Sequence, residues 1–188
     1  MTNFIIRTID IAFAILGLIF GFPILILLLV IGYFDTGAPI FIQERVGRYK
    51  KSFKLVKFRT MTVGTASVAS HLASSSSITP FGHFLRKTKL DELPQLWNVL
   101  CGQMSLVGPR PNLYNQKELI KFRDAHGVYN VRPGITGLAQ VNEIDMSMPE
   151  LLAKTDEKMI SSLSLTTYFK YILQTVTGKG SGDRVIKD

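Results

Sequence analysis

The sequence IAFAILGLIFGFPILILLLVIGYF, residues 11–34, contains 24 consecutive residues without a charged side chain. At about 1.5 Å of rise per residue, a helix of this length reaches roughly 36 Å, which exceeds the hydrocarbon core of a bilayer at about 30 Å. Its apolar side chains favour insertion by roughly 5 to 10 kcal/mol, which outweighs the cost of one internal proline at about 3 kcal/mol. The segment therefore predicts that the chain enters a membrane.

Pro23 lies near the middle of this apolar segment. Proline removes one backbone hydrogen bond and kinks a helix, so residues 1–34 are expected to form an anchor that either spans the bilayer or returns to the same face. Basic residues follow in positions 45–59, and the positive-inside rule places the rest of the chain in the cytoplasm. A cleaved signal peptide is not expected, because its apolar core would have only about 7 to 15 residues.

The basic residues of the chain are concentrated directly after the apolar segment. Residues 35–90 carry ten basic and two acidic side chains, while the rest of the chain is balanced, which gives the net charge of +8. We expect residues 45–54 to contact anionic lipid head groups. No nucleic-acid-binding motif is present. The 46% hydrophobic content and the single cysteine, Cys101, exclude a disordered chain and a disulfide-stapled fold.

The remainder is predicted to form one domain at residues 35–178, with a C-terminal tail at 179–188. Short strands or loops are expected at 39–58 and a mobile serine-rich loop at 62–79; helices are expected at 94–101, 114–126, 149–161 and 164–176. The predicted fold class is therefore α+β and mostly helical. In the last helix, Leu165, Phe169, Ile172 and Val176 form one stripe, which either faces the core or lies in the bilayer interface.

Two adjacent carboxylates, Asp91 and Glu92, precede the helix predicted at 94–101. The free N–H groups at a helix start favour negative charge, which would keep Asp91 ionised and able to attack phosphorus. The simpler alternative is that Asp91 only caps the helix. Pro109 and Pro111 fix the backbone on both sides of Arg110, whose guanidinium could grip a phosphate. Further cations are Lys57, Arg59, Arg86, Lys87, Lys89 and Arg132.

Carboxylates among cations at a membrane predict Mg²⁺-dependent phosphoryl chemistry on a lipid substrate, because Mg²⁺ prefers oxygen ligands. Zinc is not expected, since His71, His83 and His126 lack the spacing of metal ligands. The sequence has neither a G-x-G-x-x-G nor a G-x-x-x-x-G-K-[ST] fingerprint, so any nucleotide is held in another way.

Five motifs in order resemble the bacterial sugar transferase family, the monotopic phosphoglycosyl transferases. They are GAPIFIQERVG at 37–47, KFRTM at 57–61, LDELPQLWNVL at 90–100, MSLVGPRP at 104–111 and RPGITGLAQV at 132–141. The resemblance extends from the apolar segment to about residue 176 and indicates the small, catalytic-core form. It implies transfer of a sugar 1-phosphate from a UDP-sugar to undecaprenyl phosphate, with release of UMP, in a ping-pong reaction that uses Mg²⁺.

The resemblance also implies roles for individual residues. Asp91 matches the nucleophile, which would form a covalent phosphosugar intermediate, and Glu92 matches its metal-associated partner, so both are expected at the metal. The expected substrate-binding residues are Lys57, Arg59, Arg86, Arg110, Arg132, Gln140 and Asp156. Pro23 matches the break of a re-entrant helix, which implies that both ends of the anchor lie on the cytoplasmic face of a bacterial inner membrane.

Several positions depart from the family pattern. Gln103 stands in place of an acidic residue, Asn142-Glu143-Ile144 replaces a common Asn-Gly-Arg, and Met159 replaces a tyrosine. We expect these changes to bear on donor recognition and not on the chemistry.

A hypothesis of a different class is a non-catalytic, membrane-bound basic module that binds anionic lipid or a glycan-assembly partner. It accounts for the apolar segment and the basic stretch but not for the Asp91-Glu92 pair. The expected partners are thus a UDP-sugar, undecaprenyl phosphate and the membrane, without nucleic acid. The sequence leaves the sugar and any homo-oligomer open.

Overall fold

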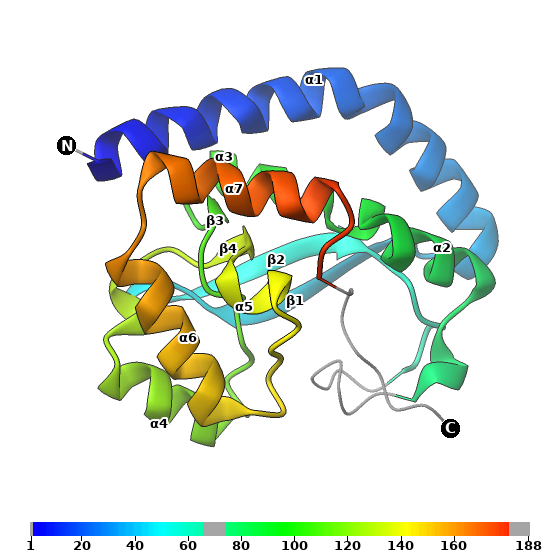
Figure 1. Ribbon diagram of the computed structural model, residues 1–188. Coiled ribbons are helices and arrows are strands. Elements are labelled where there is room, and N and C mark those ends of the chain that lie inside the picture. The colour runs from blue at the N-terminus through cyan, green and yellow to red at the C-terminus, as the bar shows by residue number, and fades with distance from the viewer. Residues whose placement is uncertain (1, 66–73, 181–188) are drawn as a thin grey trace.

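The computed structural model describes residues 2–65 and 74–180. One long helix lies over a body of short strands and helices (Figure 1). The helices are α1 (Thr2–Thr36), α2 (Pro80–Thr88), α3 (Gln95–Leu100), α4 (Lys117–Ala125), α5 (Leu138–Val141), α6 (Pro149–Ser161) and α7 (Leu165–Val176). The strands are β1 (Ile40–Val46), β2 (Ser52–Phe58), β3 (Ser105–Val107) and β4 (Gly134–Thr136). Short 3-10 turns are η1 (Arg48–Lys50), η3 (Ser75–Ser77), η4 (Leu90–Glu92) and η5 (Val128–Asn130). The predicted α+β, mostly helical class is confirmed.

Helix α1 continues through Pro23 and bends around the body of the domain (Figure 1). Its inner face is narrow and includes the buried Ile6, Ala14 and Leu28. Gly17 also belongs to this face, because a Cβ there would lie 2.8 Å from the Leu96 side chain. Most of its other apolar side chains are exposed. Among the described residues, α1 is the helix long and apolar enough to cross a membrane.

Two small sheets form the centre of the body. Strands β1 and β2 are antiparallel, with Ile40 opposite Phe58 and Val46 opposite Ser52, so the predicted strands at 39–58 are confirmed. Strands β3 and β4 form a parallel pair that the sequence pattern did not predict. They approach so closely that a Cβ on Gly134 would lie 2.0 Å from the Gly108 nitrogen. Glycine is therefore required at this position by space.

The four predicted helices are present, with small shifts at their ends. Helix α4 begins three residues later than expected, because Gln116 turns back to accept a hydrogen bond from the Leu113 backbone N–H. The sequence analysis missed α2, which Thr79 caps through its hydroxyl and which has Pro80 at its first turn. Residues 66–73 of the predicted loop at 62–79 lie outside the described residues, as does most of the predicted tail.

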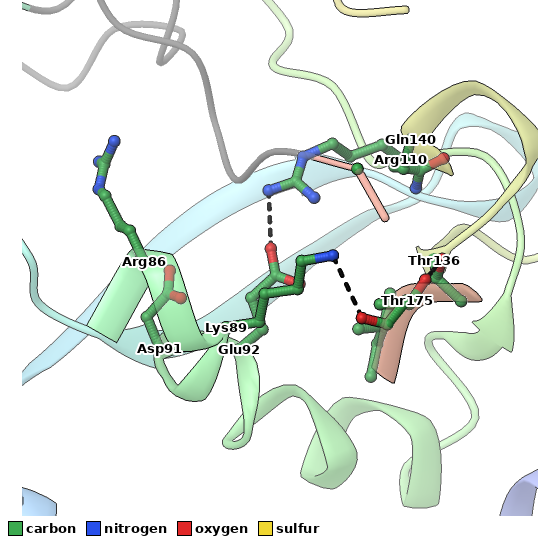
Figure 2. Close-up of a pocket in the computed structure, with 10 residues that line it drawn as sticks. Arg86, Lys89, Asp91, Glu92, Arg110, Thr136, Gln140 and Thr175 are labelled. Atoms are coloured by element: carbon green, nitrogen blue, oxygen red, sulfur yellow. Dashed lines mark hydrogen bonds and ion pairs between the residues drawn. The ribbon is translucent and has the colours of Figure 1, made fainter. Parts of the chain in front are cut away.

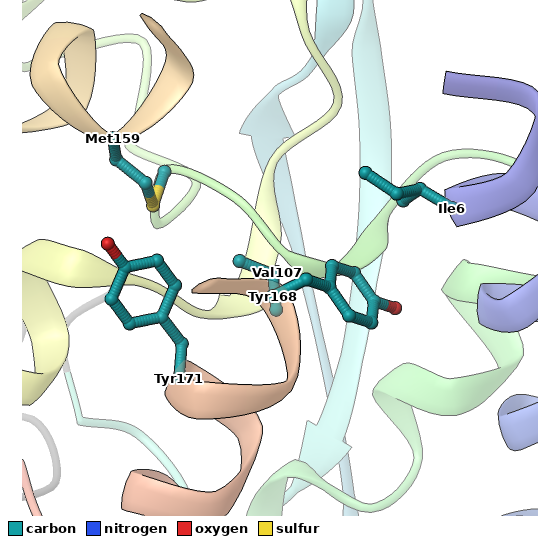
Figure 3. Close-up of a cluster of buried hydrophobic side chains, with 5 residues drawn as sticks. All are labelled: Ile6, Val107, Met159, Tyr168 and Tyr171. Atoms are coloured by element: carbon teal, nitrogen blue, oxygen red, sulfur yellow. The ribbon is translucent and has the colours of Figure 1, made fainter. Parts of the chain in front are cut away.

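Helix α7 faces the core with its tyrosines and not with its aliphatic stripe. Tyr168 and Tyr171 are buried in a cluster with Ile6, Val107 and Met159, which joins α1, β3, α6 and α7 (Figure 3). The side chains of Leu165, Phe169 and Val176 are exposed. The interpretation of that stripe as a core face is therefore wrong for these three residues, whereas Ile172 packs against the buried cluster. Since the rings of Phe13 and Phe169 lie 6.2 Å apart, the outer faces of α1 and α7 form one continuous apolar surface.

The expectation that residues 45–54 all contact lipid head groups is wrong for Arg45. Its side chain is buried, and its guanidinium donates to the Pro111 carbonyl at 3.0 Å and to Gln43 Oε1 at 2.6 Å. Arg45 therefore stabilises the backbone at Pro111, the residue after Arg110, from inside the domain.

Candidate active site

A small polar pocket lies where the end of α2, the turn η4 and the end of α7 meet (Figure 2). Four of the predicted site residues line it together with Gln140, which follows β4 in α5. The lining residues are Arg86, Lys89, Asp91, Glu92, Arg110, Ile135, Thr136, Gln140, Thr175 and Gly180. Residues far apart in the sequence thus bring two carboxylates and three cations into one place.

The carboxylates lie in η4, a single tight turn between α2 and α3. Lys89 has a positive φ of 58°, which ends α2 and redirects the chain into η4. Asp91 is 7% exposed. It is not the N-cap residue of η4 or of α3, which are Lys89 and Pro94. The interpretation of Asp91 as a simple helix cap is therefore wrong.

Arg110 pairs with Glu92 across the pocket, with 2.8 Å between Nη2 and Oε1 (Figure 2). Both side chains are mostly buried, at 26% and 13% exposure. Pro109 fixes the backbone before Arg110, and its carbonyl accepts a hydrogen bond from the Gly134 N–H at 2.9 Å. The parallel β3–β4 pair thus determines where this arginine stands.

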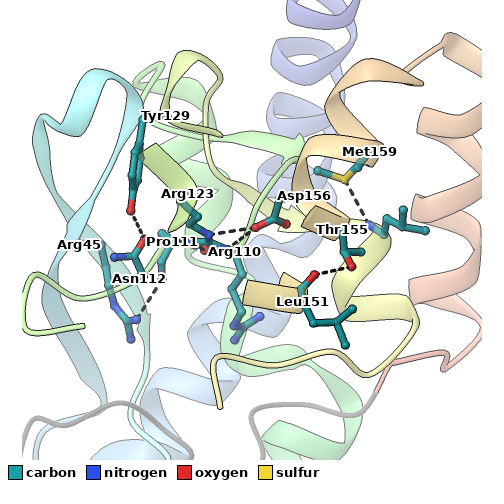
Figure 4. Close-up of polar contacts among 11 residues, drawn as sticks. Arg45, Arg110, Pro111, Asn112, Arg123, Tyr129, Leu151, Thr155, Asp156 and Met159 are labelled. Carbon is teal, nitrogen blue, oxygen red and sulfur yellow. Dashed lines mark hydrogen bonds and ion pairs between the residues drawn. The ribbon is translucent and has the colours of Figure 1, made fainter. Parts of the chain in front are cut away.

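A buried network holds the backbone of Arg110 from the other side (Figure 4). Arg123 of α4 donates from Nη1 to the Arg110 carbonyl at 2.8 Å and to Asn112 Oδ1 at 2.9 Å. Its Nε and Nη2 both donate to Asp156 Oδ2 of α6, at 3.0 and 2.7 Å. The sequence analysis missed Arg123, although its position four residues after the buried Leu119 places it on the inner face of α4.

Asp156 does not line the pocket, so the expectation that it contacts substrate is corrected. Its carboxylate is fully buried and paired with Arg123. Burial raises the pKa of this carboxyl, and the nearby guanidinium opposes that shift. In this structure Asp156 positions Arg123 and, through it, Arg110.

Lys89 reaches across the pocket to the last turn of α7 (Figure 2). Its ammonium donates to the Lys179 carbonyl at 2.7 Å and to the Thr175 carbonyl at 3.5 Å. Burial lowers the pKa of Lys89, Glu92 opposes that shift, and Arg110 lowers the pKa further. The hydroxyls of Thr136 and Thr175 also form a hydrogen bond with each other. The end of α7 is therefore bound both to Lys89 and to Thr136 at the end of β4.

Arg86 is placed by the close contact of α2 with the end of β2. A Cβ on Gly82 would lie 2.0 Å from the Thr60 carbonyl oxygen, so only glycine allows this approach. One turn later, Arg86 donates to the Thr60 hydroxyl at 2.9 Å. The helix that the sequence analysis missed therefore presents one of the predicted cations.

The other predicted cations lie outside the pocket lining. Lys57 and Arg59 both lie near the Phe41 ring, 5.7 and 5.3 Å from its centroid. Arg59 also donates to the Ala38 carbonyl at 2.8 Å. Arg132 lines a different cavity, beside the start of α1. These three residues are therefore not among those that line the pocket of Asp91 and Glu92, although β2, which carries Lys57, packs against η4.

The positions that depart from the family pattern do not line the pocket either. Gln103 accepts a hydrogen bond from Asn98 at 2.7 Å, within a network that ties α3 to β2. Met159 is buried, and its sulfur accepts the Leu138 N–H at 3.2 Å. Glu143 follows α5 in a left-handed turn and is exposed. Any effect of these departures on the donor is therefore indirect.

Gln140 is unusual among the residues that line the pocket. Both polar atoms of its amide are buried without a hydrogen-bond partner in the described part of the chain. Buried amides are nearly always paired, so an unpaired one at a pocket indicates a place for a ligand. This supports a binding role for Gln140.

Comparison with known proteins agrees with these features. The family model for bacterial sugar transferases matches residues 1–180. The chain is 36% identical to the UDP-galactose-lipid carrier transferase of Erwinia amylovora, over 93% of this chain and 40% of the relative. It is 39% identical to the undecaprenyl-phosphate galactose phosphotransferase of Salmonella typhimurium, over 77% and 34%. It is 46% identical to the UDP-glucose:undecaprenyl-phosphate glucose-1-phosphate transferase of Klebsiella pneumoniae, over 57% and 24%.

The chain therefore spans well under half the length of these three relatives. The family match, in contrast, covers nearly all of this chain. The protein belongs to the bacterial sugar transferase family.

Proposed function

We propose that the protein transfers a sugar 1-phosphate from a UDP-sugar to undecaprenyl phosphate and releases UMP. Relatives named for transfer of galactose or glucose phosphate to this lipid support the proposal. The observation that carries it is the convergence of Asp91 and Glu92 with Arg86, Lys89 and Arg110 on one pocket. A diphosphate needs cations around it, and a displacement at phosphorus needs a nucleophile beside them.

Asp91 is proposed as the nucleophile. One of its carboxylate oxygens attacks the β-phosphorus of the donor, the bond from that phosphorus to the bridging oxygen breaks, and UMP leaves with the bonding electrons. The sugar phosphate is then an acyl phosphate on Asp91. A phosphate oxygen of the lipid attacks the same phosphorus, the bond to Asp91 breaks, and the carboxylate is restored. The product is the diphosphate-linked sugar that would begin assembly of a glycan.

The cations around the pocket are suited to the charge that moves in these steps. Arg110 stands on a backbone fixed by two prolines, so its guanidinium can hold a phosphate with little loss of conformational freedom. When the donor binds, a phosphate can take the place that Glu92 now holds on Arg110. Gln140 offers an unpaired amide to the same pocket. We expect it to bind a polar group of the donor.

Mg²⁺ fits the residues present. The described residues contain no group of three or more His, Cys, Asp or Glu side chains, which argues against a closed protein cage. Mg²⁺ is commonly held by one or two carboxylates together with substrate phosphates and waters. Asp91 and Glu92 would supply the carboxylate oxygens. When bound, Mg²⁺ would neutralise charge on the diphosphate.

We further propose that α1 is a re-entrant membrane helix and that the body lies on the cytoplasmic face. Both ends of α1 bind the same body. Arg7 donates to the Leu100 carbonyl at 3.2 Å, and Asp35 accepts from the Thr79 hydroxyl at 2.7 Å. A helix held in this way cannot have its ends on opposite sides of a bilayer while those contacts persist.

The test of the reaction is UMP release by the detergent-solubilised protein with Mg²⁺, undecaprenyl phosphate and a panel of UDP-sugars. Release with one donor, dependent on lipid and metal, is expected for the wild type. Asp91→Asn should lower it by at least about a thousandfold, because the amide is not a nucleophile. Asp124→Asn is the matched control, since its exposed ion pair with Lys50 contributes little.

Two results would count against the proposal. Folded wild-type protein that releases no UMP with any donor would favour the non-catalytic membrane module. Equal rates for Asp91→Asn and Asp124→Asn would exclude Asp91 as the nucleophile.

A further inference from the structure

A second cavity of about 280 Å³ lies at the start of α1, on residues that the pocket of Asp91 does not use. Its lining comes from α1, the turn η1, the segment after β3, the stretch before β4 and the end of α6. The lining residues are Ile6, Arg7, Asp10, Arg48, Ser105, Val107, Gly108, Pro109, Asn130, Val131, Arg132, Met159, Ile160 and Leu163.

One part of this lining is strongly basic. Arg7, Arg48 and Arg132 come from three separate parts of the chain, and none forms an ion pair with a described residue. Each is fixed by a backbone carbonyl instead. Arg48 Nε donates to Asn130 O at 2.9 Å, and Arg132 Nε donates to Gly102 O at 2.8 Å. Three preorganised guanidiniums around one cavity form a site for an anion.

The cavity has a single acid, Asp10, against these three arginines. Asp10 is 1% exposed, and its Oδ1 accepts from the Ser105 hydroxyl, the Leu106 N–H and the Tyr168 hydroxyl at 3.0, 2.8 and 2.7 Å. Its charge is therefore committed to docking α1 on β3 and α7. Burial lowers the pKa of Arg132, repulsion from Arg7 and Arg48 adds to that effect, and attraction to Asp10 opposes it. A bound anion would relieve the repulsion.

The rest of the lining includes apolar side chains. Ile6 and Val107 line the cavity, together with Ile160 and Leu163 at the approach to α7. Two neighbours of lining residues in the sequence are exposed apolar side chains. They are Phe4, two residues before Ile6, and Leu165, two residues after Leu163. An anion that also carries hydrocarbon fits both kinds of lining, whereas a free phosphate would use only the arginines.

We propose that this cavity binds the phosphate head group of an anionic membrane phospholipid, with the lipid chains lying along α1 and α7. The site is distinct from the pocket of Asp91 and goes beyond the transfer reaction. It rests on the proposed membrane placement and not on catalysis. A lipid bound here would hold the start of α1 against the body and fix the depth of the domain at the bilayer surface.

The test is titration of the detergent-solubilised full chain with phosphatidylglycerol, measured by native mass spectrometry. Phosphatidylcholine provides the zwitterionic comparison, and inorganic phosphate the comparison without hydrocarbon. We expect one phosphatidylglycerol to bind in preference to both. Arg48→Gln and Arg132→Gln should each raise its Kd about tenfold or more, because each removes a charge-assisted hydrogen bond. Lys121→Gln, an equal charge change on an exposed lysine of α4 outside the lining, should leave the Kd unchanged.

Equal binding of the two phospholipids, or unchanged affinity in the arginine variants, would overturn the proposal. Displacement of the lipid by an equal concentration of inorganic phosphate would also overturn it, since the site would then serve a free anion. A thermal unfolding measurement accompanies each variant, and Arg48→Lys, which keeps the charge but not the planar fork, tests the site if Arg132→Gln does not fold. Failure of the transfer reaction would appear as missing UMP release, which these titrations do not measure.

Discussion

Lys89 combines a backbone task and a side-chain task in one residue. Its φ of 58° ends α2 and starts the turn that holds Asp91 and Glu92. Its ammonium crosses the pocket to the end of α7. A lysine in the left-handed region costs about 1 kcal/mol or more relative to glycine. The side chain therefore gives a reason for lysine at a position where glycine would be less strained.

We predict that deprotonation of Lys89 limits activity at alkaline pH. Because burial lowers the pKa of this ammonium below its ordinary 10.5, the loss should begin below that pH. Lys89→Arg should extend activity to higher pH, since a guanidinium keeps its charge above pH 12. The measurement is the pH dependence of UMP release for both proteins. Superimposable alkaline limbs would show that another group titrates.

Some predicted site residues belong to short sequence motifs, whereas the places of others depend on the packing of distant elements. Asp91, Glu92 and Arg110 could be found because a carboxylate pair and a Pro-Arg-Pro segment are visible in a few consecutive residues. The places of Arg132 and Asp156 could not be predicted, because only the packing of distant elements shows which cavity or partner they face. Arg123 was missed for the same reason.

Helices α4 and α6 are joined by a buried ion pair that also reaches the site. Arg123 and Asp156 are 1% and 0% exposed, and Arg123 continues to the Arg110 backbone. A buried charge without its partner is costly, whereas two apolar replacements can be neutral. Variants of this pair can therefore separate its effect on the stability of the domain from its effect on the position of Arg110.

We predict that Asp156→Asn lowers the free energy of unfolding by about 3 to 5 kcal/mol, because it leaves Arg123 buried without a counter-charge. The double variant Asp156→Leu with Arg123→Met should recover most of that stability, as measured by thermal unfolding. Its kcat/KM should nevertheless fall about tenfold, because the bond to the Arg110 carbonyl is lost. A stable double variant with full activity would show that the network is only structural.

The helices α6 and α7 were predictable because their periodicity is long and their starts are marked, by Pro149 in α6 and by the Ser164 cap in α7. The parallel β3–β4 pair was not, because each strand has three residues and its pairing depends on a close approach at Gly134. Helix α2 carried a readable signal in the Thr79-Pro80 start, yet it lies directly after the serine-rich segment. These two missed elements place Arg86 and Arg110.

At the scale of the whole molecule, the body presents one apolar side. The outer faces of α1 and α7 are exposed. Helix α3 packs against α1, and its Trp97 side chain is 58% exposed. A continuous exposed apolar surface indicates a contact with a membrane or a partner, and the long apolar α1 favours a membrane. The bend of α1 keeps both of its ends on the body (Figure 1).

The re-entrant arrangement predicts that both ends of α1 are on one side of the membrane. In a Cys101→Ser background, Phe4→Cys and Lys51→Cys place single thiols at exposed positions near the start of α1 and on the body. A membrane-impermeant maleimide should label neither in intact cells and both in inside-out vesicles. Labelling of Phe4→Cys alone in intact cells would establish a single membrane span.

The central claim is that Asp91 carries the sugar phosphate between two displacements. Intact-mass spectrometry of the protein, after incubation with Mg²⁺ and the donor that supports UMP release but without lipid acceptor, tests it directly. The account predicts one added sugar phosphate on the wild type, none on Asp91→Asn, and its loss when undecaprenyl phosphate is added. Absence of the adduct in protein that releases UMP only when the lipid is present would contradict the claim and indicate direct transfer.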